Sequence, residues 1–431
     1  MLLGTSISVQ SYGQPMRALA NDGTIEFLLD EPFSEVVFSD DLHWVGRTFR
    51  VYEGQQSQRG YVEDLTLIYV GRVTDVTHDT KRAIIRTGDA FVDLDGPLIT
   101  AFYPDDALSS IASKPMPQVI GTVFCIEPVL SDPVNVIYDI STIPITQVLD
   151  LRVGGISWAE SAAYPPGEGE WSLSVERTQV ALGSATLGGD VRMDVEGLAV
   201  AGVGGLAGQI AVTRGAAVDG GALGGVELYT VGNYAKDPIN TLNTMDDIFT
   251  GAACWWGISP LGLLIAGLIA PPSDAADVPT VLDGRNVLSI SLSQTVPPAW
   301  RIRVEFERHW QTEGQFFDAI EESEKQRWSA PGLVVTREDA SIKDAEPRAI
   351  DVPIMRSVAV NASDGNVIAN YFWAAWSVRR EVLDVRAWID PREIKLYDTI
   401  SVDYMMFRKN YRIISAIRSI GGGPAQLQLW G

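Results

Sequence analysis

A chain of 431 residues can hold two to four domains at about 100–200 residues each, and its 46% hydrophobic residues exclude a disordered chain. The formal net charge is −22, with 36 Asp and Glu against 15 Lys and Arg in residues 1–300 and 19 against 18 in residues 301–431. This acidic balance argues against specific nucleic-acid binding and against attraction to anionic lipid.

Short runs of β-branched and aromatic residues, separated by Gly and Asp, fill the first part of the chain. They cover residues 25–29, 46–54, 64–79 and 82–94. A period of two along such runs predicts strands, and their close spacing predicts an antiparallel β domain.

The next segment, residues 89–121, is too polar for a core and too rich in Pro and Gly for a helix. Its prolines restrict the free chain and fix the local path. We therefore predict a long, ordered crossing between two β domains, although an ordinary ordered loop needs the same residues. The prolines are Pro97, Pro104, Pro115 and Pro117.

A further strand is predicted over 171–182, before a Gly/Ala-rich span at 198–225 that is typical of a connector. Within that span, GVGGLAG (202–208) superficially resembles a dinucleotide-binding loop. It lacks the preceding strand, the following helix and the downstream acidic residue of a βαβ unit. We interpret it as a flexible connector.

A helix is predicted over 237–252, with Pro238 near its start and Leu242, Met245 and Phe249 at helical spacing. It should pack against a sheet.

The uncharged run 250–273 is long enough to cross a bilayer. Pro260 and several glycines interrupt it, its charged neighbours are acidic, and it ends in Ala-Pro-Pro. We predict buried strands around a turn. The opening residues 1–10 lack a charged n-region and a long apolar core, so we expect a cytosolic start.

Residues 291–310 and 382–389 predict strands, and the second places Leu383, Val385, Ala387 and Ile389 on one face. Between them, residues 312–328 predict a packing helix that ends before Pro331. Its apolar stripe comprises Phe316, Phe317 and Ile320.

The predicted fold class is mainly β (α+β), multidomain, with antiparallel β-barrels or sheets and a few packing helices. Composition shifts at 198–225, 270–279 and 337–349. From these shifts we expect an N-terminal β domain (1–121), a second β domain with a Gly-rich insertion (122–232), an α+β domain (233–345) and a C-terminal β-barrel domain (346–431).

Residues that could carry chemistry are sparse. Cys125 and Cys254 are too few for a disulfide framework or a thiolate metal cage, so we expect buried free thiols. No HExxH, paired CxxC or GxSxG motif is present. We interpret the three histidines as surface or strand residues rather than as ligands. They are His43, His78 and His309.

Two acidic groups could in principle supply the acid and base of a glycosidase, but such groups usually lie on solvated strands. They are Glu168, Glu170 and Glu176, and Asp190, Asp194 and Glu196. Two aromatic groups could stack on sugars, but residues this dense are more often core or interface anchors. They are Trp255 with Trp256, and Tyr371, Phe372 and Trp373 with Trp376. We expect no catalytic, cofactor-binding or metal-binding residue, and no cofactor.

The order of features nevertheless resembles one family. Strand–turn–strand runs at 46–54, 67–79 and 84–98 end in D-x-x-x-x-L-D-x-P-L, and KPMPQVIG (114–121) leads into 122–155. A strand pair at 255–272 ends in Ala-Pro. The closing run 391–431 contains LYDTISV, YRII and LQLWG. This order is similar to that of tail-tip hub or baseplate hub proteins of long-tailed phages related to the Mu-like siphophages. Only the Gly/Ala-rich 198–225 departs from the pattern.

The resemblance implies a non-enzymatic virion protein, made in the host cytoplasm, that joins the tail tube to the tip and receptor-binding proteins. It implies a homotrimer with two tube-like barrels per subunit, contacting the distal tail protein, the tail tube and other hub and fibre proteins. Genomic DNA would pass through the lumen during ejection. The alternatives are a distal tail ring protein and a carbohydrate-binding or carbohydrate-degrading tail component.

Overall fold

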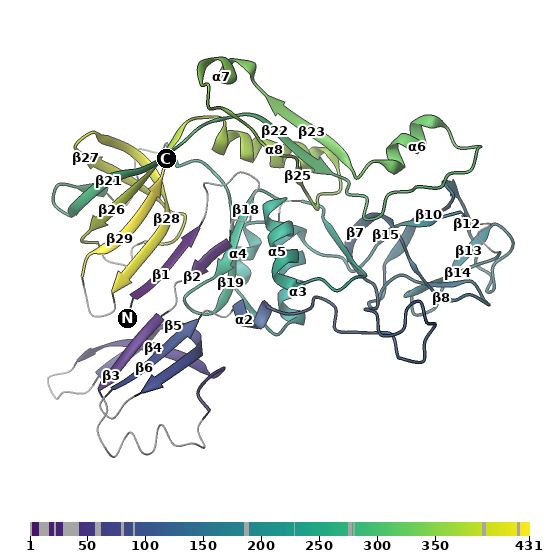
Figure 1. The fold of residues 1–431 in the computed structure, drawn as a ribbon, viewed down its shortest axis with the longest axis horizontal. Coiled ribbons are helices and arrows are strands. Elements are labelled where there is room, and N and C mark those ends of the chain that lie inside the picture. The colour runs from purple at the N-terminus through teal and green to yellow at the C-terminus, as the bar shows by residue number, and fades with distance from the viewer. Residues whose placement is uncertain are drawn as a thin grey trace.

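The computed structural model describes most of the chain (Figure 1). The described residues are 2–7, 17–20, 23–28, 43–56, 62–78, 82–88, 91–184, 189–227, 229–274, 278, 281–389, 394–419 and 423–431. Their strands form five sheets and their helices are short, so the predicted mainly β class is confirmed.

The first sheet contains the strands predicted near the N-terminus. It runs in the order β3–β6–β5–β4, and every pairing is antiparallel. The strand predicted over 82–94 ends at Gly88, and a single helical turn, α2, follows it. The elements are β3 (Gly23–Leu28), β4 (Thr48–Gln56), β5 (Val62–His78), β6 (Arg82–Gly88) and α2 (Phe91–Leu94).

The turn-rich connection is ordered over its described part and does more than cross between sheets. Leu94, Leu98 and Ile99 are buried in the largest hydrophobic core. Pro97 bridges to Asn240, and Phe102 bridges to Pro115. Backbone hydrogen bonds and buried leucine and isoleucine side chains therefore hold this path in place.

Two five-stranded sheets then pack face to face around a second core. Val119, Leu151, Trp171, Val180 and Met193 are among its buried residues. One sheet has the order β11–β10–β15–β7–β17 and the other β12–β13–β14–β9–β8. The strands are β7 (Gln118–Ile126), β8 (Val129–Asp132), β9 (Ile137–Asp139), β10 (Gln147–Val153), β11 (Ile156–Ser157), β12 (Ala159–Glu160), β13 (Glu170–Leu173), β14 (Gln179–Leu182), β15 (Val191–Glu196) and β17 (Gly232–Ala235).

The Gly/Ala-rich span is not a flexible connector, and that prediction was wrong. Residues Gly202–Thr213 form a helix, α3, whose Val203, Leu206 and Ile210 are fully buried. The small residues have a packing role, because a Cβ on Gly204 would lie 2.2 Å from the Leu223 carbonyl oxygen of the next helix. That helix is α4 (Gly220–Gly224), and β16 (Ala217–Val218) joins the two helices.

The predictions for residues 237–273 are confirmed. Helix α5 (Thr241–Thr250) begins after Asn240, whose side chain accepts a hydrogen bond from the Leu242 backbone N–H. The uncharged run forms a buried hairpin of β18 (Cys254–Ile258) and β19 (Leu263–Leu268), which turns at residues 259–262. Within the described parts of the chain, no helix is both long and apolar enough to cross a bilayer.

A fourth sheet lies above the central core in Figure 1 and is covered by helix α8. Its order is β23–β22–β24, with β25 also pairing to β22. The elements are β22 (Ala299–Phe306), β23 (Leu333–Glu338), α7 (Ala340–Ala345), β24 (Ile350–Asp351), β25 (Met355–Arg356) and α8 (Ala362–Trp376).

The helix predicted over 312–328 is confirmed only in its second half, and its predicted packing role is wrong. Helix α6 spans Glu322–Ser329 and buries none of its residues. The aromatic residues before it instead pack on a glycine turn of the second core. The Phe317 ring would lie 2.6 Å from a Cβ on Gly154, and the Phe316 ring would lie 3.0 Å from a Cβ on Gly155. Those two glycines, both at positive φ, leave room for the aromatic rings.

The last sheet curls around a third core at the C-terminal end. Strands from the first and last parts of the sequence lie in it, and β1 (Leu2–Ile7) pairs with β28 (Phe407–Ser419). A hairpin of β1 and β2 (Arg17–Ala20) then connects β28 to β18, so one sheet extends from β16 to β21. The other strands are β20 (Val281–Asp283), β21 (Val287–Val296), β26 (Arg380–Ala387), β27 (Thr399–Tyr404) and β29 (Ala425–Trp430).

Candidate assembly surfaces

The C-terminal sheet has two faces of opposite character. Leu383, Val385 and Ala387 of β26 are buried in its core, and Ile389 packs against that core, so the predicted apolar face is confirmed. The alternate residues line a hollow of about 540 Å³ on the other face. There the Gln428 side-chain amide donates to Asp384 Oδ1 at 3.0 Å. This face is polar and nearly neutral, with Ser289, Ser291, Asp384, Arg386, Gln426 and Gln428 among its lining residues.

Strand β21 forms an edge of this sheet. It pairs with β26 on one side, and no described strand pairs with its other side. Its ten residues carry no charge, and Leu288 and Leu292 are about half exposed. Sheet edges of this length can accept a strand from another chain.

A buried ion pair lies in the second β region, where sequence reasoning assigned no role to Arg152. Its Nη1 donates to Asp194 Oδ2 at 2.7 Å and to Asp150 Oδ2 at 2.6 Å, and its Nη2 donates to Asp194 Oδ1 at 2.9 Å. Arg152 is 2% exposed and Asp194 6% exposed. Asp194 also accepts the Cys125 backbone N–H at 2.7 Å, so the pair ties three strands together.

Helix α6 and the segment before it dock on this ion pair. The Trp328 ring lies 3.7 Å from the Arg152 guanidinium carbon, which is a cation–π contact. Beside it, Glu313 is 1% exposed, so its carboxyl group is almost fully removed from water. Burial therefore raises the pKa of Glu313. These contacts connect the region around β22 to the second core.

A crevice of about 390 Å³ lies between the turn-rich connection and the second core. Tyr103 donates to Asp139 Oδ2 at 2.7 Å, and burial together with that carboxylate raises the pKa of Tyr103. Lys236 forms an ion pair with Glu127. Both basic and acidic side chains line the crevice, and their charges balance each other. The contacts in it hold the turn-rich connection against the second core.

The structure gives the carboxylates proposed for a glycosidase other roles. Asp194 pairs with Arg152, Asp190 lies 3.2 Å from Arg192, and Glu196 accepts from the Gln147 amide at 2.6 Å. In the other group, Glu170 accepts a backbone N–H from Gly167, while Glu168 and Glu176 are exposed. The two groups lie on different strands and loops and do not form one acidic cleft.

The three histidines and the two cysteines lie in different elements of the fold. His43 is exposed, and His78 is the last residue of β5. His309 is buried, with its Nδ1 donating to the Ala330 carbonyl at 2.7 Å. Both cysteines are buried free thiols, as predicted, and burial raises the pKa of Cys125 to about 12. Among the described residues, no group of three or more His, Cys, Asp or Glu could hold a metal ion.

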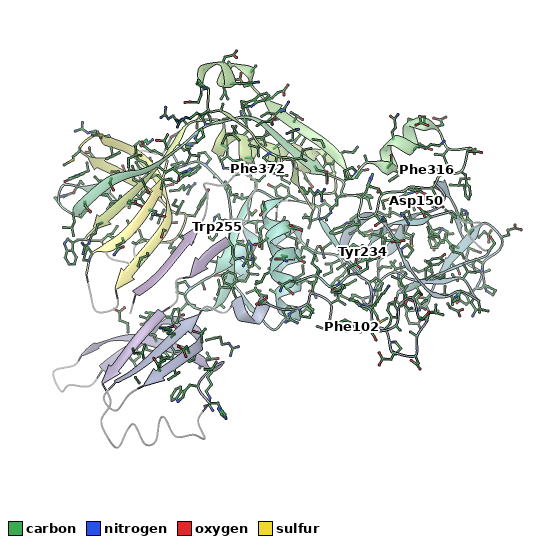
Figure 2. The ribbon with its side chains drawn as sticks, in the orientation of Figure 1. Phe102, Asp150, Tyr234, Trp255, Phe316 and Phe372 are labelled. Atoms are coloured by element: carbon green, nitrogen blue, oxygen red, sulfur yellow. The ribbon has the colours of Figure 1, made fainter. Side chains whose placement is uncertain are left out.

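The aromatic groups belong mainly to the central core, as predicted. Trp256 is fully buried, stacks on Phe249 and donates to Asp246 Oδ1 at 3.0 Å. Phe372 is also fully buried and stacks on Trp376. Figure 2 places Trp255 and Phe372 in the middle of the molecule. These rings are therefore not available as a sugar-stacking platform.

Comparison with known proteins gives structural similarity only. No protein-family model and no curated protein matches the sequence. The 43 kDa tail protein of prophage MuSo2 from Shewanella oneidensis is 11% identical, with 99% of this chain and 93% of that chain covered and a TM-score of 0.39. A tail protein from Neisseria meningitidis MC58 is 8% identical, with 100% and 91% covered and a TM-score of 0.43.

A chain of a native gene transfer agent virion is 9% identical, with 77% of this chain and 88% of that chain covered and a TM-score of 0.49. Every one of these TM-scores is below 0.5. The function of this chain therefore has to be argued from its own residues.

Proposed function

We propose that this chain is a structural protein of a phage tail, a hub that connects the tail tube to the tip and receptor-binding proteins. One observation carries the proposal. The C-terminal strands whose sequence resembles the closing barrel of hub proteins lie side by side as β27, β28 and β29 and curl around their own core. The two sheets around the second core supply another β body in the same subunit.

Two β bodies per subunit suit a threefold hub below a sixfold tube. Three copies present six bodies, so a trimer can match a hexameric ring without a second gene product. The long uncharged edge of β21 supports strand pairing or edge covering between subunits. The hub is therefore proposed to be a homotrimer in contact with the distal tail protein and fibre proteins.

The charge distribution supports a path for DNA. Residues 1–300 carry 36 acidic against 15 basic residues, and a negative lumen repels DNA phosphates and lets the duplex slide without binding. Reversing the charge of lumen-facing carboxylates should slow ejection. Unchanged ejection in such variants would remove the lumen from this proposal.

The first test is the mass of the purified chain by light scattering, together with class averages from negative-stain images. We expect a closed threefold ring. A sixfold ring would instead assign the chain to the distal tail position. Beyond assembly, a stop codon in the gene should produce particles with incomplete tails, and infectious particles with normal tails would contradict a tail function altogether.

A further inference from the structure

The connection between β22 and β23 is far longer than these two strands need. Phe306 pairs with Leu333 across them, so residues 307–332 form the loop of one hairpin, which we name the strap. A hairpin closes with about 2–5 residues, and connections much longer than that usually have a function of their own. The strap leaves its own sheet, and in Figure 1 its helix α6 lies above β10 and β15 of the second core.

Backbone contacts attach the strap to two neighbouring strands of the second core. The Gln311 N–H donates to the Cys125 carbonyl of β7 at 2.9 Å. On β15, Arg192 Nη2 donates to the Thr312 carbonyl at 3.4 Å. The first part of the strap therefore lies across β7 and β15, which pair with each other.

Aromatic side chains attach the strap to β10, the next strand of the same sheet. The Phe317 ring packs on Gly154, and the Phe317 N–H donates to the Gly154 carbonyl at 2.9 Å. Farther along, the Trp328 ring lies 3.7 Å from the Arg152 guanidinium carbon. The docked strap therefore joins the fourth sheet to three adjacent strands of the second core.

One residue of the docked strap opposes docking. Glu313 is 1% exposed, and a carboxylate loses favourable hydration when it is buried. Burial raises the pKa of Glu313, against the effect of the arginines beside it. The groups that face it come from all three strands and are Arg152 at β10 with the Gly155 backbone N–H, Asp190 and Arg192 at β15, and the Cys125 thiol on β7.

The rest of the strap has little to lose when it lifts. Helix α6 buries none of its residues, and Phe317 and Trp328 are only partly buried. Lifting also returns the Glu313 carboxylate to water. Segments with few buried contacts open at a free energy below that of global unfolding. The docked and lifted forms of the strap are therefore close enough in free energy to exchange within the folded chain.

We infer that the strap is a latch, which holds the second core against the fourth sheet when it is docked and frees it when it lifts. β17 and the turn-rich connection stay attached to the second core, so release frees it only from the fourth sheet. Because Glu313 is buried only in the docked form, docking takes up protons, and the latch loosens as the pH rises. The latch goes beyond the proposed tail function and does not depend on it.

Hydrogen exchange in low urea, followed by mass spectrometry in peptides covering 310–318, tests the release. These amides should exchange through an opening of their own, at a free energy well below that of global unfolding. Phe317→Ser should raise the opening constant about 10-fold, because one aromatic ring no longer packs on the second core. Trp388→Ala, at a ring outside the strap that is 53% exposed, is the control and should leave it unchanged. Strap amides that exchange only with global unfolding would overturn the latch.

A second variant tightens the strap instead of loosening it. Glu313→Gln removes the titrating group, so its opening constant should lie below that of the wild type, and the difference should grow from pH 5 to pH 8 after correction for intrinsic exchange. Asp318→Asn, which changes an exposed carboxylate of the same strap, is the matched control and should follow the wild type at each pH. Equal opening of Glu313→Gln and the wild type across this range would overturn Glu313 as the group that loosens the latch.

Spin labels measure whether release frees the second core. Val175→Cys, 95% exposed between β13 and β14, and Val367→Cys, 41% exposed on α8, give one label on each side, while both native cysteines are buried. The distance distribution between the labels should be narrow in the wild-type background and broader with Phe317→Ser. A distribution that stays narrow while the strap opens would show an ordinary mobile loop and would overturn the latch.

Discussion

At the scale of single residues, Arg152 determines how the second core is held together. The guanidinium group is buried beneath Trp328 and bonded to Asp194 and Asp150. Arg152→Leu would leave Asp194 buried without a counter-charge, so we expect a loss of about 3–5 kcal/mol in the free energy of unfolding, measured by urea denaturation. Arg301→Leu, which breaks a more exposed pair with Asp351, should cost about 0–1 kcal/mol. Equal losses would contradict this assignment.

Glu313 gives a prediction that depends on pH. Its pKa in the folded chain is raised by burial, so between its ordinary pKa and the raised value the folded state binds more protons than the unfolded state. Stability contributed by the protonated carboxyl is therefore complete at low pH and is lost as the pH rises. Glu313→Gln should be nearly neutral in acid and should stabilise the chain increasingly toward pH 7, measured by thermal unfolding across pH. A variant that is destabilising at pH 7 would contradict the sign.

At the scale of elements, helix α3 depends on glycine for packing rather than for flexibility. A Cβ on Gly204 would lie 2.2 Å from a backbone oxygen of α4, whereas a Cβ on Gly208 would meet only the Leu223 side chain at 3.5 Å. Gly204→Ala should therefore destabilise the chain by about 1–3 kcal/mol. Gly208→Ala should stabilise it by up to about 1 kcal/mol, because Ala is the better helix former. Opposite shifts in the midpoint of chemical unfolding would confirm the difference.

A local sequence pattern predicts a helix or strand correctly where one face of that element packs against one hydrophobic core. The strand at 382–389 follows its alternation, and α5 follows its 3.6-residue spacing and its Asn240 cap. Helix α3 could not be predicted in this way, since its glycines disfavour a helix and only contact with α4 makes them useful. Arg152 was missed because its partner Asp194 is 42 positions away.

At the scale of the whole molecule, the β1–β2 hairpin is the connection that makes one sheet out of two regions. β1 pairs with β28 of the C-terminal core on one side and with β2 on the other, and β2 continues to β18 of the central core. Arg17 of β2 strengthens this link, because its guanidinium group bonds to Asp246 of α5 at 2.5 Å and 3.2 Å. The two cores are therefore joined in one sheet through β1 and β2.

Thr5→Pro tests this connection. Thr5 is paired on both sides, with Ala20 and with Ala416, so proline removes a ladder hydrogen bond from an interior strand. Hydrogen exchange followed by mass spectrometry should become faster in β28 and β18 and should stay unchanged in β7 and β15, which belong to another sheet. Leu2→Pro is the control, since the first residue of a strand tolerates proline. Equal exchange in both variants would mean that the two cores hold their positions without the hairpin, and the link would then lie in the packing of the central helices.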